Sequence, residues 1–267
     1  MIDALIFSKN RPMQLHCLLS SLKEYSNIPI SKIKVLYRYD EEYVEGFKKL
    51  QNIHKEVKFI KEENFELQVK EYLRFGEKYC VFFVDDILIK DEINFSIPCD
   101  VLDQNPHMLC FSLRLGTHLT DCYPTSTKQL IPNGTINSQF FIWGWKNAPQ
   151  DWGYPLSVDG HIFRRNELEG WSSHLRFKNP NQFESSLQEI PRTFAIPLGM
   201  VCHVNSKLFN NPVNRVQDEF QNRVESSVSP QEFNKLWNEG FEINYSEFKG
   251  YLNPAAHTPV KFSLRKS

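Results

Sequence analysis

The sequence shows little excess charge of either sign. Its 267 residues carry 31 Lys and Arg against 32 Asp and Glu, a formal net charge of −1. This balance provides no basic stripe of the kind that displaces counterions from phosphates, so we expect no nucleic-acid partner. With 24% charged and 41% hydrophobic residues, the composition is typical of a globular protein long enough to bury a sizeable core.

Cysteine motifs and long apolar runs are also missing. The six cysteines form neither a CxxC pair nor the Cys and His spacing of a structural zinc site, which predicts buried, reduced thiols. The apolar stretch from Ala4 to Phe7 is far shorter than a signal-peptide core, and no run approaches the roughly 20 residues that span a bilayer. We therefore expect a cytoplasmic protein.

Predicted strands and helices alternate through the first third of the chain. Apolar runs rich in β-formers mark the strands, and leucines at helical spacing mark the first helix. This alternation predicts an α/β fold with a mostly parallel, Rossmann-like sheet flanked by helices and ligands at the carboxyl ends of its strands. The predicted strands are residues 3–7, 33–37, 57–60 and 79–84, and the helices are residues 15–22, 41–50 and 65–75.

After about residue 95 the chain becomes loop-rich, and no repeat or flexible linker separates it from the first part. We therefore expect a single domain over residues 1–267. The last 20 residues contain four basic residues and no acid, so this end is either an ordinary solvated tail or a peripheral contact with anionic lipid. Further strands are predicted at residues 108–113 and 198–203, and helices at 182–188, 213–224 and 230–238.

Polar residues follow the predicted strands of the first part. Ser8 to Arg11 follow the first strand, Asp40 follows the second, and Asp85 and Asp86 follow the strand of residues 79–84. Adjacent carboxylates at the end of a buried strand need a cation or hydrogen-bond donors to offset their charge. Mg²⁺ or Mn²⁺ suits such oxygen ligands. A surface turn with two solvated acids is the alternative.

Two of these motifs resemble a known family. Ser8-Lys9-Asn10-Arg11-Pro12 before a Leu-rich helix, with Phe83-Val84-Asp85-Asp86-Ile87 about 70 residues later, resembles the GT-A nucleotide-sugar glycosyltransferases, especially family-2-like bacterial enzymes. Segments at residues 157–164, 179–184 and 201–205 resemble later parts of such enzymes. The resemblance implies a GT-A-like fold with a nucleotide-sugar-binding half, a loop-rich acceptor and catalytic half, and a C-terminal extension, over about residues 1–95, 96–225 and 226–267.

The resemblance also implies a donor site and a metal at the strand ends. Mn²⁺ or Mg²⁺ would be held by Asp86 and His203. The family usually has Asp-any-Asp where this chain has Val84-Asp85-Asp86, so which of the two aspartates contacts metal stays open. The implied donor-binding residues are Ser8, Asn10, Arg11, Asp40, Arg74, Asp85 and Arg215.

For catalysis and acceptor binding, the resemblance points to the second half. Inverting transfer requires one carboxylate to accept the proton of the attacking hydroxyl. Glu184 is implied as this base, with Asp159 as its rival or otherwise an acceptor-binding residue. Trp152 and Tyr154, in an aromatic-rich stretch, would stack on acceptor sugars, and packing in a core cluster is the alternative.

Together these roles describe an enzyme that moves a sugar from a nucleotide-diphosphate-sugar donor to a hydroxyl of a glycan or lipid-linked acceptor, with inversion and metal dependence. A sugar nucleotidyltransferase is one alternative, although the Gly-rich phosphate loop expected of it is missing from Ser8 to Pro12. A catalytically silent carbohydrate-binding protein on the same fold is another, because fold and function separate easily.

Overall fold

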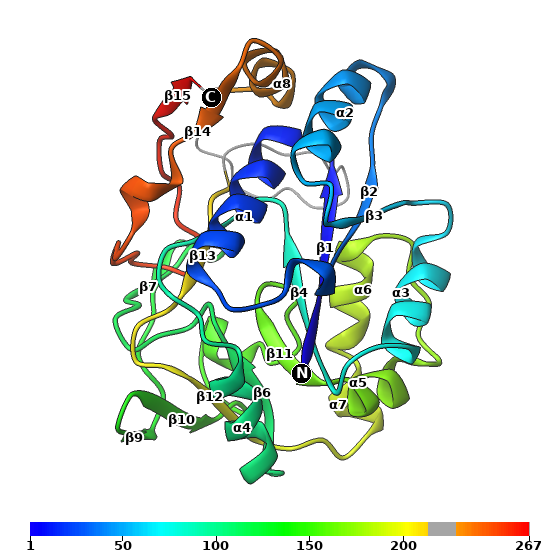
Figure 1. The fold of residues 1–267 in the computed structure, drawn as a ribbon. Coiled ribbons are helices and arrows are strands. Elements are labelled where there is room, and N and C mark those ends of the chain that lie inside the picture. Colours follow the sequence, from blue (N-terminus) through cyan, green and yellow to red (C-terminus); the bar gives the residue numbers. More distant parts are fainter. Residues whose placement is uncertain (213–227, 267) are drawn as a thin grey trace.

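The computed structural model describes residues 1–212 and 228–266 (Figure 1). Its centre is a nine-stranded sheet with the order β3-β2-β1-β4-β11-β6-β12-β10-β9. The strands of this sheet are β1 Ile2–Lys9, β2 Ile33–Arg38, β3 Lys58–Lys61, β4 Tyr79–Val84, β6 Met108–Ser112, β9 Gly134–Asn137, β10 Phe140–Gly144, β11 His161–Arg164 and β12 Gly199–His203.

Strand direction determines which loops meet at one edge of this sheet. β1 is parallel to β2 and β4, and β2 is parallel to β3. β11 is antiparallel to both β4 and β6, and β12 is parallel to β6. The carboxyl ends of β1, β2, β4, β6 and β12 therefore share one edge with the start of β11. The expected α/β fold with a mostly parallel sheet is confirmed.

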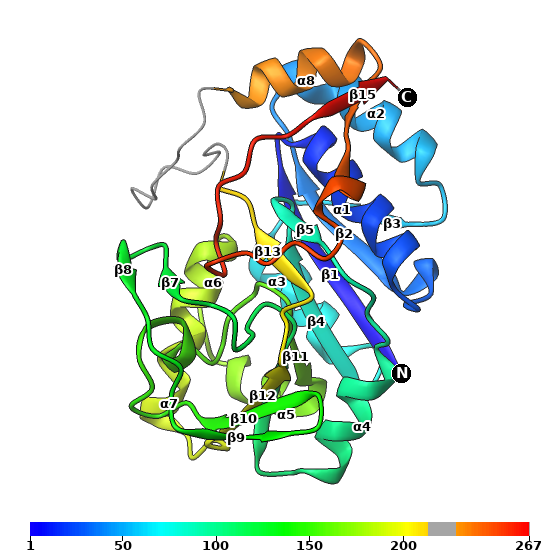
Figure 2. The ribbon, with the colours of Figure 1, turned by 90° about the vertical axis from the view of Figure 1, so that its left-hand side faces the viewer.

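Helices cover both faces of the sheet (Figures 1 and 2). One face carries α1 Pro12–Tyr25, α2 Val44–Ile53 and α8 Pro230–Asn238, and the other carries α3 Phe65–Arg74, α5 Arg165–Ser172 and α6 Pro180–Leu187. The remaining elements are α4 Ser96–Gln104, α7 Ile190–Thr193, the short turns η1 Ile30–Lys32, η2 Glu41–Tyr43, η3 Gln150–Gly153 and η4 Tyr245–Phe248, and the strand pairs β5 Ile87–Ile89 with β13 Leu208–Asn210, β7 Asp121–Cys122 with β8 Thr127–Lys128, and β14 Phe241–Ile243 with β15 Leu264–Lys266.

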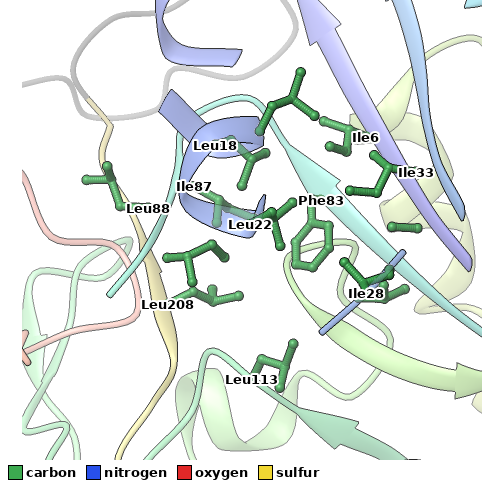
Figure 3. Packing of buried hydrophobic residues seen from close by; sticks show 14 of the residues in the cluster. Ile6, Leu18, Leu22, Ile28, Ile33, Phe83, Ile87, Leu88, Leu113 and Leu208 are labelled. Carbon is green, nitrogen blue, oxygen red and sulfur yellow. The ribbon is translucent and has the colours of Figure 1, made fainter. Parts of the chain in front are cut away.

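Alternating side chains of the central strands divide the core between the two faces. In β4, Val81 and Phe83 pack in the cluster beneath α1, whereas Cys80 and Phe82 pack in the opposite cluster. Figure 3 shows Phe83 against Leu22 in the first cluster. Successive strand side chains point to opposite faces, so an unbroken apolar run is the pattern of a strand covered on both sides. Burial of each such phenylalanine contributes about 1.5–3 kcal/mol.

The predicted elements of the first third are present with small shifts of their ends. β4 and α8 match their predicted ranges to the residue. The predicted helix at residues 213–224 lies outside the described residues. The structure adds β9, β10 and β11 in the stretch expected to be loop-rich, where strands of four or five residues are too short to give a clear period.

The basic C-terminal segment is held against the fold through residue 266. β15 pairs with β14, and Arg265 Nε lies 2.6 Å from Glu242 Oε1. Lys266 lies over the ring of Phe241. All six cysteines are buried free thiols, as expected. Within residues 1–212 and 228–266, no helix combines the length and the apolar character needed to cross a membrane.

Candidate active site

The loop after β1 meets the end of β2 through reciprocal hydrogen bonds. Asn10 Nδ2 donates to Asp40 Oδ2 at 2.6 Å, and the Asp40 backbone N–H donates to Asn10 Oδ1 at 2.9 Å. Asn10 has a φ of 57°, a conformation that asparagine tolerates better than most residues. Ser8 is buried, and its hydroxyl has no partner in the part of the chain that the structure describes. The structure thus brings Ser8, Asn10 and Asp40 to one edge.

Asp85 and Asp86 meet Arg11 at the same edge and form what we call the aspartate cluster. Asp85 accepts from Arg11 Nη1 at 2.8 Å and from the backbone N–H of Lys9 at 3.1 Å, so both of its oxygens are engaged. Asp86 accepts from Asn210 Nδ2 at 3.1 Å and makes only a long contact of 3.4 Å with Arg11 Nη1. Asp86 is therefore the less saturated of the two carboxylates.

The electrostatic environment of Asp86 favours a bound cation. Burial, together with the charges of Asp85 and Asp159, raises the pKa of Asp86 to about 6, although Arg11 and the hydrogen bond from Asn210 act to lower it. Among the described residues, no group of three or more His, Cys, Asp or Glu side chains is placed to hold a metal ion. Mg²⁺ commonly binds through one or two carboxylates together with substrate phosphates and water. Asp86 fits that arrangement, and residues 1–212 and 228–266 form no cage of protein ligands alone.

His203 lies at the end of β12 between two aromatic rings. Its ring centroid is 5.0 Å from that of Phe111 and 5.4 Å from that of Phe140. Burial lowers the pKa of His203 to about 4, and the charges that act on this pKa are those of Lys207 and Asp91. The structure does not pair His203 with Asp86, and its role as a metal ligand stays a prediction.

Arg114, two residues after β6, is the centre of a second group of charges at this edge. Its Nη1 lies 3.0 Å from both Ser157 Oγ and Asp159 Oδ2, and its Nη2 lies 3.1 Å from Asp151 Oδ1. The side chains of the three charged residues are at most 10% exposed. We call Arg114, Asp151, Ser157 and Asp159 the arginine cluster. Such buried pairs are costly to break from one side, because a charge is then left without a partner.

Asp159 reaches the arginine cluster because β11 runs against its neighbours. The turn before β11 lies where β4 and β6 end, and Gly160 in this turn has a φ of 76°, which favours glycine. A Cβ at Gly160 would lie 2.7 Å from Leu208 Cδ2. The Gly160 N–H donates to Phe82 O at 2.8 Å, which ties the turn to β4. The bend at Asp159 and Gly160 directs the Asp159 carboxylate toward Arg114.

Glu184, on α6, has a pKa raised further toward neutral pH than that of Asp86. Its Oε1 accepts from Ser157 Oγ at 2.8 Å and from the Val158 backbone N–H at 3.0 Å. Burial and the nearby charge of Asp159 raise the pKa of Glu184 to about 7, although both hydrogen bonds and Arg114 act to lower it. A partly exposed carboxyl whose pKa lies near the working pH is suited to general acid–base chemistry.

The two aromatic residues predicted to bind acceptor lie in different environments. Trp152 has 0% exposure, and its ring packs 4.9 Å from that of Trp143 and 5.6 Å from that of Phe141. The structure corrects the prediction for Trp152, because η3 turns this ring into the core and leaves no face for a sugar. Tyr154 is partly buried, and burial together with the adjacent Glu184 raises the pKa of its hydroxyl.

Of the two implied donor-binding arginines outside the first loop, Arg74 lies within the part of the chain that the structure describes. Arg74 is the exposed last residue of α3, and the chain then leads into the start of β4 at Tyr79. Arg74 therefore lies toward the amino edge of the sheet, opposite the aspartate cluster, which corrects its assignment as a donor-binding residue. Arg215 lies outside the described residues.

A C-terminal segment links the two clusters and was missed by sequence reasoning. The Asn210 N–H donates to Ala256 O at 2.9 Å, and the Thr258 N–H donates to Asn210 O at 2.8 Å. His257 Nε2 lies 3.6 Å from Asp159 Oδ2. Figure 2 shows this red segment beside β13. Residues 256–258 thus contact Asn210, which holds Asp86, and also the arginine cluster.

Similarity to one curated protein agrees with the resemblance seen in the sequence. No protein-family model matches the chain. Among curated proteins, it is similar to the bifunctional glycosyltransferase pgtA of Dictyostelium discoideum, with 26% identity over 282 residues. The similarity covers 93% of this chain and 36% of that protein, so the chain spans about a third of the length of this curated relative.

Solved structures show weaker similarity. Staphylococcus aureus TarS 1-349 has 14% identity and a TM-score of 0.44, covering 75% of this chain and 57% of that one. A cytidylyltransferase from Leptospira borgpetersenii has 14% identity and a TM-score of 0.43, covering 72% and 71%. The mannosyltransferase PcManGT from Pyrobaculum calidifontis, in complex with GDP-Man and Mn²⁺, has 11% identity and a TM-score of 0.43, covering 77% and 56%. Likeness at this level identifies no function for the chain.

Proposed function

We propose that this chain transfers a sugar from a nucleotide-diphosphate-sugar donor to a hydroxyl of a glycan or lipid-linked acceptor, with inversion at the transferred carbon. The observation that carries the proposal is the placement of Glu184, with a pKa of about 7, at the same sheet edge as the aspartate cluster. The curated relative is itself a glycosyltransferase by name, which supports the proposal. The buried free thiols support a cytoplasmic location.

The donor would lie along the ends of β1, β2 and β4. Asp40 offers carboxylate oxygens to base or ribose donors, and Asn10 holds Asp40 in place. Asp86 would hold Mn²⁺ or Mg²⁺ shared with the donor diphosphate, while Asp85 positions Arg11. A divalent ion bound there would stabilise the negative charge of the leaving diphosphate.

The chemical step assigned to Glu184 is removal of a proton. As the acceptor oxygen bonds to the anomeric carbon, Glu184 takes the hydroxyl proton, and the bond from that carbon to the diphosphate oxygen breaks with its electron pair. The products are a glycoside, a nucleoside diphosphate and protonated Glu184. Ser157 and the Val158 N–H hold the carboxylate through one oxygen, which orients the other for this task. Asp159 is bound to Arg114 and is the weaker candidate for the base.

The first test measures donor binding without an acceptor. Purified protein is screened by thermal shift against UDP-, GDP-, CMP- and dTDP-sugars, each with Mn²⁺ and with EDTA, because a ligand that binds only the folded state raises its stability. We expect one nucleotide to raise the melting temperature and EDTA to remove the effect. The absence of any shift would contradict the donor site and favour a silent carbohydrate-binding protein.

Two variants and the reaction products complete this test. Asp40→Ala is expected to weaken donor binding about tenfold or more, the scale of a lost hydrogen bond to a charged group. Glu41→Ala removes an exposed neighbouring carboxylate and serves as the control. A transferase releases a nucleoside diphosphate from the donor, whereas a sugar nucleotidyltransferase forms pyrophosphate, so the released product separates these two functions.

A further inference from the structure

A hollow of about 210 Å³ lies on the C-terminal side of the arginine cluster. Its walls are the β7–β8 hairpin and residues 254–259, and they include Thr127, His257 and Thr258. The two walls are joined because the backbone N–H groups of Thr120 and Asp121 both donate to Pro254 O, at 2.9 and 3.0 Å. Figures 1 and 2 both show β7 next to this stretch of the red C-terminal chain.

His257 connects the hollow to the arginine cluster. Its ring lines the hollow, and its Nε2 lies 3.6 Å from Asp159 Oδ2. Burial lowers the pKa of His257, so its imidazole is neutral at pH 7 and offers one donor and one acceptor nitrogen. The side chain of His257 therefore lies between the hollow and Asp159, and the charge of Asp159 also raises the pKa of Glu184.

Buried polar atoms of His257 and of the arginine cluster lack hydrogen bonds. Within the described residues, His257 Nδ1, Arg114 Nε and Asp151 Oδ2 have no partner. Each unpaired buried polar atom costs about 1–3 kcal/mol, and such atoms are few in native structures. Three of them around one ion-pair cluster indicate a place where hydroxyl groups or water complete the hydrogen bonding.

We propose that this hollow, here called the hairpin pocket, binds the sugar ring of the acceptor, with His257 as a positioning residue between that ring and Asp159. This inference rests on the proposed glycosyl transfer and assigns its acceptor side. The hollow's volume of about 210 Å³ is room for one sugar ring. Its walls combine hydroxyl groups with prolines and Ala255, a mixture that suits both the hydroxyls and the C–H faces of a sugar.

The test measures binding of free sugar rings to the full chain. The probes are the methyl glycosides of glucose, galactose, mannose and N-acetylglucosamine, titrated by saturation-transfer NMR with the donor's nucleoside diphosphate present. Thr127→Trp fills the hollow from an exposed hairpin position, and Leu130→Trp places the same ring at a site that is 80% exposed and outside the hollow. His257→Gln changes the positioning residue and keeps a hydrogen-bonding side chain.

The expected result is binding of at least one glycoside to the wild type. Thr127→Trp should weaken that binding about tenfold or more, the scale of one lost pocket contact, and Leu130→Trp should leave it within about twofold. His257→Gln should weaken glycoside binding and leave nucleoside-diphosphate affinity unchanged. Equal glycoside affinity in wild type and Thr127→Trp, or no glycoside binding to a wild type that binds the nucleotide, would overturn the acceptor pocket alone. A wild type that binds no nucleotide sugar would overturn the proposed function.

Discussion

Glu184→Gln is expected to slow the transfer reaction and to stabilise the fold at high pH. The folded chain raises the pKa of Glu184 from its ordinary 4.5 to about 7, mainly through burial. The folded state therefore holds this proton more tightly than the unfolded state, and stability is lost as the pH rises from about 4.5 to about 7. At 1.36 kcal/mol per pKa unit, the loss reaches about 3 kcal/mol above pH 7.

Glutamine has no proton to lose and its oxygen keeps the hydrogen bonds from Ser157 and Val158. The Glu184→Gln variant should therefore be more stable than wild type at pH 8, by up to about 3 kcal/mol, and close to wild type at pH 4.5. In a chain of this length each kcal/mol shifts the melting temperature by about 2 °C, so the expected rise at pH 8 is about 6 °C. Thermal melts from pH 4.5 to 8 measure it.

Turnover of the same variant should fall, because the base is gone. Donor breakdown is followed as nucleoside diphosphate release, with water or a methyl glycoside as the attacking hydroxyl. The wild-type rate should rise with pH through about 7 and then level, as Glu184 becomes ionised. Glu184→Gln should lose about 10²–10⁴-fold in rate while donor affinity stays unchanged.

Glu189→Gln is the matched control for this experiment, because it removes an exposed carboxylate just after α6, paired with Arg192. It should change neither the melting temperature at pH 8 nor the rate. Full turnover in Glu184→Gln would refute its role as base. If Asp159→Asn instead removes the pH step while Glu184→Gln retains it, the base is Asp159.

Three further predictions concern the rest of the site. Asp86→Asn should abolish the EDTA-sensitive part of donor binding, and equal affinities with Mn²⁺ and with EDTA in wild type would contradict its metal role. Arg114→Met leaves Asp151 and Asp159 buried without their partner and should destabilise the fold by about 3–5 kcal/mol in denaturant titrations. His203→Phe preserves the aromatic packing between two rings, so retained Mn²⁺-dependent donor binding would exclude His203 as a ligand, and its loss would establish it.

The sheet edge that carries Asn10, Asp40 and the aspartate cluster was predictable from the sequence, because these residues follow strands with a clear local pattern. β1 and β4 are short apolar runs that stop at polar residues, and parallel strands place their carboxyl ends together without further information. Asn10, Asp40 and the Asp85-Asp86 pair were found in this way. Their hydrogen-bond partners could not be predicted in this way. The different hydrogen bonding of Asp85 and Asp86 depends on Asn210, which is more than 120 residues away.

The aromatic stretch shows where local composition fails. Trp152 is flanked by Asp, Gly and Tyr, which favours a turn at the surface, and the turn exists as η3. The ring nevertheless points inward, because β10 places Phe141 and Trp143 on the same face and the three rings pack together. The direction of a side chain in a short turn depends on the side chains of the neighbouring strand, and local composition does not predict which of them it will contact.

The direction of one strand explains why the second half of the site was harder to find than the first. A rule that ligands bind at carboxyl ends selects the residue after a strand, yet β11 is antiparallel and presents the turn before it. Asp159 therefore lies at the site because it precedes a strand, whereas Asp86 lies there because it follows one. Strand direction depends on pairing with β4 and β6, which are distant in sequence, so the meeting of Asp159 with Arg114 follows from topology and not from any local motif.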